Sequence, residues 1–101
     1  MKVKIEGYGE TNDFANDKNM GFVTYKVSNL DAKSLDYLKE NLEGKIKIAN
    51  DFLYITLFYN ENMFPFQSNE AKAKINDFIS CEEIEMTAFL TSFLEDMLWL
   101  K

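Results

Sequence analysis

The sequence of 101 residues contains no histidine and no arginine. Histidine is the usual general base near neutral pH and the commonest metal ligand, and arginine is the usual ligand for phosphate and carboxylate groups. Without histidine, a Cys–His nucleophile is impossible. We therefore expect a binding protein and not an enzyme, with no cofactor and no catalytic or structural metal.

The chain is also poor in cysteine and has no long apolar run. Cys81 is its one cysteine, so an internal disulfide is impossible. No continuous apolar segment of the secretory type follows Met1, and polar residues interrupt the apolar C-terminal segment, which is therefore not expected to cross a membrane. These features favour a cytoplasmic protein, in the host cytoplasm if a phage encodes it.

Acidic residues outnumber basic ones. There are 17 carboxylates against 11 lysines, which gives a formal net charge of −6. Such a charge disfavours direct binding to nucleic acid or to an anionic membrane, and it favours a basic partner. The hydrophobic content of 47% is sufficient for the core of a single compact domain over residues 1–101.

Period-two alternation predicts strands over residues 2–6 and 21–28, with the polar residues 7–19 between them as a long loop or irregular hairpin. Residues 45–49 and 52–59 predict a second hairpin, which turns at Asn50-Asp51. The segment 52–59 is apolar on both sides, so it is either covered on both faces or displays an aromatic patch.

Helical spacing of leucines follows Ser28 and Asn29, either of which can cap a helix that Gly44 ends. Ser68 can cap a short second helix. Ser80 and Glu83 have capping-box spacing, which predicts a break before a third, apolar helix. The predicted order is ββαββαα. It indicates an α+β fold, with a four-stranded, mainly antiparallel sheet and helices on one face.

Carboxylates and aromatic residues are the candidate partner-binding groups. First-turn acids such as Glu82 also have a simpler explanation, because they complement the helix dipole. The candidate acids are Glu61, Glu70, Glu82, Glu83, Glu85, Glu95 and Asp96, and the candidate aromatic anchors are Tyr54, Phe58 and Tyr59.

In size, acidity and lack of catalytic motifs, the chain resembles immunity proteins and phage anti-defence proteins, including anti-CRISPR and DNA-mimic inhibitors. The resemblance implies a non-enzymatic inhibitor that covers a basic, nucleic-acid-binding surface of a partner protein. The carboxylates would take the place of phosphates, and charge would steer the association.

Residues 18–25, Lys-Asn-Met-Gly-Phe-Val-Thr-Tyr, resemble part of the aromatic strand motif of RNA-recognition-motif domains. Asn19 and Met20 stand where that motif has glycine and an aromatic residue. Because the net charge is also negative, we expect no direct contact with nucleic acid.

The last helix carries an apolar seam whose simplest explanation is packing on the sheet. The second hypothesis for the protein is a structural or assembly domain that forms a homodimer through this helix, since interface cores favour aromatic and methionine side chains. The dimer contact candidates are Phe93, Met97 and Trp99. A third hypothesis is a small ligand-binding domain that uses carboxylates alone.

Overall fold

Four strands and three helices follow one another in the order ββαββαα, so the predicted α+β fold is confirmed. The computed structural model describes residues 1–13, 18–42, 45–60 and 63–99. The elements are β1 (Lys2–Asp13), β2 (Lys18–Ser28), α1 (Ala32–Asn41), β3 (Lys45–Ala49), β4 (Phe52–Asn60), α2 (Asn69–Ala73) and α3 (Ile75–Trp99). The sheet is antiparallel with the order β1-β2-β4-β3, so β2 and β4 are its central strands.

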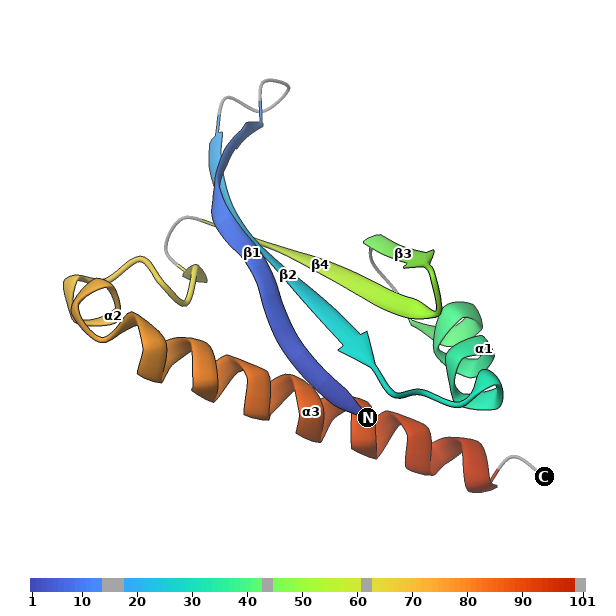
Figure 1. Cartoon of the computed structure of the whole chain (residues 1–101). Helices are drawn as coiled ribbons and strands as arrows, with labels where there is room; N and C mark the ends of the chain where they lie inside the picture. Colours follow the sequence, from blue (N-terminus) through green and yellow to red (C-terminus); the bar gives the residue numbers. More distant parts are fainter. Residues whose placement is uncertain (14–17, 43–44, 61–62, 100–101) are drawn as a thin grey trace.

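The first hairpin is longer than the sequence predicts. β1 and β2 have 12 and 11 residues, so most of residues 7–19 is strand. The long-loop alternative is wrong, and the irregular hairpin is the alternative that the structure has. A bulge between Ile5 and Gly7 shifts the register and allows pairing to continue, with Tyr8 opposite Val23. The apolar and aromatic residues of β2 favour pairing strongly enough to extend it through the glycines of β1. Figure 1 shows the end of β1 and the start of β2 extending away from α3.

The second hairpin turns at the predicted dipeptide. Asn50 and Asp51 have positive φ angles of 53° and 66°. Two consecutive residues in the left-handed region make a turn whose twist matches that of the flanking strands, and Asn and Asp tolerate this region better than most residues. The prediction of a tight hairpin at this position is confirmed.

The start of α1 differs by a few residues from the prediction. Asp31 is the N-cap, and its carboxylate accepts a hydrogen bond of 2.7 Å from the backbone N–H of Ser34. Asn29, one of the two expected caps, instead has a φ of 59° in the turn before the helix. The hydrogen bond from Ser34 is the main reason that the pKa of Asp31 is lowered. Gly44, the expected end of the helix, lies outside the described residues.

The break between the last two helices lies earlier than predicted. Ser68 caps α2 as expected, by accepting a hydrogen bond of 3.0 Å from the backbone N–H of Ala71. The chain then breaks at Lys74, and α3 continues for 25 residues through Ser80. The predicted capping box is wrong because Ser80 lies inside α3 and is not its N-cap, and the side chain of Glu83 accepts a hydrogen bond from β1.

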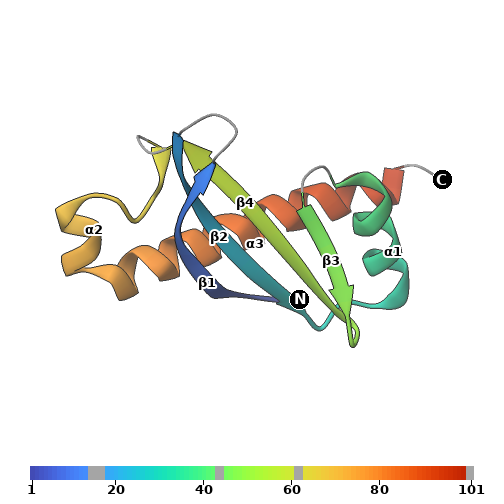
Figure 2. The ribbon, with the colours of Figure 1, turned by 90° about the horizontal axis from the view of Figure 1, so that it is seen from above.

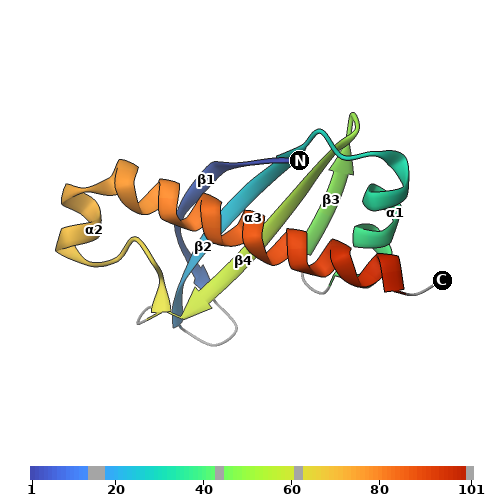
Figure 3. The ribbon, with the colours of Figure 1, turned by 90° about the horizontal axis from the view of Figure 1, so that it is seen from below.

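The core lies between the sheet and α3, which crosses one face of the sheet (Figures 1 and 3). From α3, Met86 and Leu90 are buried, so packing of this seam on the sheet is confirmed for both. α1 adds Leu38 at one end of the layer. The buried core residues of the sheet are Val3, Val23, Tyr25, Val27, Leu53 and Ile55. In the described part of the chain, no helix has the length and apolar character needed to span a membrane.

Candidate functional site

The face of the sheet opposite α3 carries no helix of the described chain, as Figures 2 and 3 show from its two sides. We call this surface the open face. Its side chains alternate along each strand with the buried residues of the core. The open face is formed by Lys4 on β1, by Phe22, Thr24 and Lys26 on β2, by Phe52, Tyr54, Thr56 and Phe58 on β4, and by Lys47 on β3.

A basic row crosses all four strands of the open face. Lys4 is the register partner of Lys26, Lys26 is the partner of Tyr54, and Tyr54 is the partner of Lys47. Adjacent strands lie about 5 Å apart, so the row is about 15 Å long. Three lysines in line, without an intervening acid, create a locally positive surface on a protein whose net charge is −6.

Aromatic rings lie on both sides of this row. The Nζ atom of Lys26 lies 4.1 Å from the centroid of the Phe52 ring, which is within the range of a cation–π interaction. On the other side, Phe22 and Phe58 are register partners, and Phe58 is 41% exposed. The open face therefore combines positive charge with accessible aromatic surface.

Gly9 makes room for one of these rings. A Cβ atom added to Gly9 would lie 3.2 Å from Cε1 and 3.4 Å from Cζ of Phe22, so the ring extends across the neighbouring strand. Gly9 and Phe22 are register partners, and an aromatic ring over a glycine is a known means of stabilising a strand pair. Between the rings and the basic row, the hydroxyls of Thr24 and Thr56 form a hydrogen bond of 3.0 Å.

Acidic residues gather on the opposite side of the molecule. α3 carries six carboxylates and no basic residue. Among them, Glu85, Glu95 and Asp96 are exposed. The three lysines of the open face and the exposed carboxylates of α3 therefore lie on opposite sides of the sheet.

Two of the candidate acids are turned toward the sheet. Glu83 accepts a hydrogen bond of 2.8 Å from the backbone N–H of Ile5, and Glu82 accepts a long one of 3.4 Å from the Tyr25 hydroxyl. Burial raises the pKa of Glu82 above its ordinary value, and the neighbouring carboxylate of Glu85 raises it further. Burial is also the main reason that the pKa of Tyr25 is raised. Glu82 and Glu83 therefore serve the core and are poor candidates for contact with a partner.

The remaining candidates are dispersed over the molecule. Tyr54 and Phe58 lie on the open face, whereas Tyr59 lies on the opposite side of β4. Burial raises the pKa of Tyr59, and its ring lies 6.4 Å from that of Phe64 between centroids. Glu70 is exposed on α2, and Glu61 lies outside the described residues. Among the described candidates, Tyr59 lies near Glu82 and Glu85, whose charges raise its pKa further, whereas Tyr54 and Phe58 lie on the open face, away from the acids of α3.

The dimer candidates also differ in their surroundings. Phe93 is half-buried, with its ring centroid 5.6 Å from that of Tyr37 on α1 and 5.9 Å from that of Phe89. Met97 is half-buried, and the side chain of Trp99 lies outside the described part of the structure. Phe89, which was not among the dimer contact candidates, is the most exposed aromatic side chain among those described on α3, at 54%.

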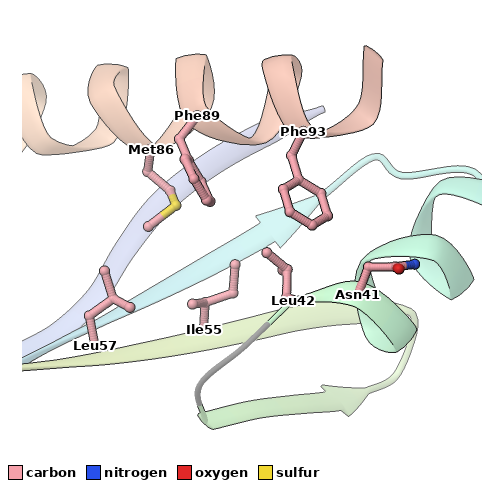
Figure 4. A pocket seen from close by; sticks show the side chains of 7 residues that line it. All are labelled: Asn41, Leu42, Ile55, Leu57, Met86, Phe89 and Phe93. Atoms are coloured by element: carbon pink, nitrogen blue, oxygen red, sulfur yellow. The ribbon is translucent and has the colours of Figure 1, made fainter. Parts of the chain in front are cut away.

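A groove separates α3 from β4 near the end of α1 (Figure 4). Its volume is about 420 Å³. It is lined by Asn41, Leu42, Ile55, Leu57, Met86, Phe89 and Phe93. The one amide in this lining, on Asn41, donates a hydrogen bond of 2.8 Å to the backbone carbonyl of Tyr37. The described residues of this lining are thus mainly apolar and include no carboxylate.

Two findings concern possible metal ligands and the cysteine. No cluster of three or more cysteine, aspartate and glutamate side chains in this part of the chain is arranged to hold a metal ion. Cys81 is exposed within α3 and does not lie at the N-terminus of that helix.

The lysines of the open face were not among the candidates from the sequence. The alternation of β2 and β4 did indicate which residues share a side, but only the register shows that Lys4, Lys26 and Lys47 come into one row. The net charge did not indicate this row because it sums the charges of the whole protein and not those of one face.

The fold and this surface define a two-layer α+β protein with an open, lysine- and aromatic-bearing sheet. The chain belongs to the family described as "Family of unknown function (DUF5750)", whose model matches residues 2–96. A comparison with curated proteins found no match.

Proposed function

We propose that this protein is a binding protein that holds an anionic macromolecule against its open face. The observation that carries the proposal is the row formed by Lys4, Lys26, Tyr54 and Lys47 across all four strands. Clustered lysines on an extended, helix-free surface attract polyanions by charge and by the release of their counterions.

The negative net charge is compatible with this proposal because the exposed acids of α3 lie on the other side of the sheet from the open face. Glu85, Glu95 and Asp96 are exposed on α3, which lies across the other face of the sheet. A helix with its side chains is about 10 Å thick. That thickness exceeds the screening length of about 8 Å in physiological salt, so these acids weaken the field of the open face only slightly.

A second copy of the same open face is a poor occupant of this surface. Face-to-face stacking that places the basic row of one copy on the basic row of the other would bring like charges together, which opposes association. Charge complementarity therefore favours an anionic ligand over a homodimer at the open face.

Titration with heparin at two salt concentrations, between about 50 and 200 mM, tests the proposal. We expect Lys47→Gln to weaken heparin binding and to reduce its salt dependence, because one ionic contact is lost. Lys39→Gln is the matched control, since Lys39 is an exposed lysine on α1 and outside the open face. Equal binding by the two variants, or no binding by the unmodified protein, would overturn the proposal.

The exposed side of α3 favours a second candidate function, the inhibitor of a basic surface that the composition suggests. Ile84 and Phe89 are 69% and 54% exposed on this helix, and Glu85 is exposed beside them. Apolar anchors with adjacent acids suit a basic protein partner, such as a nucleic-acid-binding enzyme blocked by an anti-CRISPR or immunity-type protein. In this case, salt-sensitive capture of that partner should be lost with Phe89→Ala and retained with Lys47→Gln.

A further inference from the structure

We propose that the anionic ligand is single-stranded nucleic acid, whose bases stack on aromatic rings of β2 and β4 while its phosphates contact the lysines. This inference rests on the proposed function, since it uses the same open face. It adds a role for the aromatic residues, which charge alone does not explain.

The rings lie on the two central strands, which is where a ligand lying across the sheet must pass. Tyr54 and Phe58 are four residues apart on β4, so their side chains are about 13 Å apart along the strand. Phe22 lies opposite Phe58 on β2. This arrangement offers stacking positions at two levels of the sheet, separated by the paired hydroxyls of Thr24 and Thr56.

The lysines lie on both sides of these rings. Lys4 is on the edge strand β1 and Lys47 is on the opposite edge strand β3, with Tyr54 between them in the same row. Lys26 lies against the ring of Phe52, at 4.1 Å from its centroid. That contact assigns Phe52 to positioning a lysine. The residues therefore favour an arrangement in which the bases lie over the central strands of the sheet and the phosphates lie toward its edge strands.

The aromatic rings distinguish among anionic ligands. An acidic protein or a sulfated polysaccharide satisfies the lysines but offers no stack of flat rings to Tyr54 and Phe58. The bases of a duplex are already stacked inside it, whereas those of a single strand are free to stack on aromatic side chains. Stacking of this kind depends little on base identity, so we expect weak sequence preference.

The test is a fluorescence anisotropy titration with a labelled oligo(dT) and a labelled oligo(U), each about 12 nucleotides long. Heparin and poly-glutamate serve as anions without bases, and a duplex of the same length completes the set. The variants are Tyr54→Leu and Phe58→Leu, which remove the aromatic ring but keep an apolar side chain. Phe89→Leu is the matched control, because Phe89 is an exposed phenylalanine on α3, away from the open face.

We expect both single strands to bind more tightly than the duplex or poly-glutamate. Tyr54→Leu should weaken single-strand binding about tenfold and leave heparin binding unchanged, because one stacking contact is lost. Phe89→Leu should change neither. A higher affinity for oligo(U) than for oligo(dT) would identify RNA as the preferred single strand, because the 2′-hydroxyl is the group through which proteins tell RNA from DNA.

The outcomes separate this inference from the proposed function. If heparin binds with dependence on Lys47 but Tyr54→Leu has no effect on oligo(dT) or oligo(U), the single-strand inference is overturned and the anion-binding function stands. Tighter binding of poly-glutamate than of either oligonucleotide would identify an acidic protein as the ligand and would also overturn the inference. If no anion binds the unmodified protein, both proposals fall. Thermal unfolding of each variant confirms that the fold is retained.

Discussion

The backbone N–H of Ile5 donates a hydrogen bond of 2.8 Å to Oε2 of Glu83, and this bond joins the edge strand β1 to the middle of α3. It lies beside the bulge between Ile5 and Gly7. An edge strand has backbone donors without a strand partner, and a bulge disrupts the ladder further. The carboxylate of Glu83 therefore accepts a hydrogen bond from the N–H of Ile5 at the place where β1 changes its register with β2.

Loss of this bond should destabilise the protein. We expect Glu83→Ala to lower the free energy of unfolding by about 1.5–3 kcal/mol, because a donor in a partly buried place loses a charged acceptor. Glu85→Ala, at an exposed position on the same helix, should change it by less than about 0.5 kcal/mol. Urea unfolding followed by circular dichroism measures both. Similar losses for the two variants would show that the bond to Ile5 contributes little.

Glu82 should make stability depend on pH. Burial raises its pKa above the ordinary value of 4.5, so the folded state binds this proton more tightly than the unfolded state. The contribution of Glu82 to the free energy of unfolding is therefore largest below pH 4.5 and falls as the pH rises through the raised, folded pKa. Glu82→Gln does not ionise and should lose this dependence.

Urea unfolding of Glu82→Gln and the unmodified protein at several pH values tests this expectation. As the pH rises from 4.5 toward neutrality, the free energy of unfolding of Glu82→Gln should increase relative to that of the unmodified protein. Glu70→Gln is the control, since Glu70 is exposed on α2. A difference that moves in the opposite direction would mean that the hydrogen bond from Tyr25 outweighs the effect of burial.

Two glycines of the first hairpin should differ strongly in their tolerance of alanine. A Cβ atom at Gly21 would overlap the ring of Phe64 and would lie 2.9 Å from the Cβ of that residue, whereas a Cβ at Gly7 would have no neighbour within 4 Å. We expect Gly21→Ala to lower the free energy of unfolding by about 1–3 kcal/mol, as overpacking does. Gly7→Ala should have little effect. Thermal unfolding of the two variants gives the comparison, and equal melting temperatures would contradict it.

The sequence predicted those elements whose signals are local. The turn at Asn50 and Asp51 and the cap at Ser68 depend on side chains within a few residues of the backbone that they support. Element order followed from these local signals together with the periodicity of apolar residues.

The errors arose where a distant partner decides the structure. Glu83 has the spacing of a capping box, but its carboxylate accepts a hydrogen bond from the N–H of Ile5, which is 78 residues away in sequence. Strand β1 extends through its glycines because β2 pairs with it. The basic row across the sheet likewise depends on the order of the strands. The sequence around Lys4, Lys26 or Lys47 does not reveal that order.

Alanine substitutions of Phe93 and Phe89 should distinguish packing within the protein from dimer formation through α3. Phe93 is half-buried and lies between the rings of Tyr37 and Phe89. Phe93→Ala should lower the free energy of unfolding by about 2–3 kcal/mol, less than for a fully buried phenylalanine. Phe89 is 54% exposed, so Phe89→Ala should lower the free energy of unfolding by less than Phe93→Ala does.

If the helix forms a homodimer, sedimentation equilibrium should show that Phe89→Ala shifts the protein toward monomer while its fold persists. A dimer that survives Phe89→Ala and is lost on Phe93→Ala, with no change in monomer stability, would show instead that Phe93 is the contact.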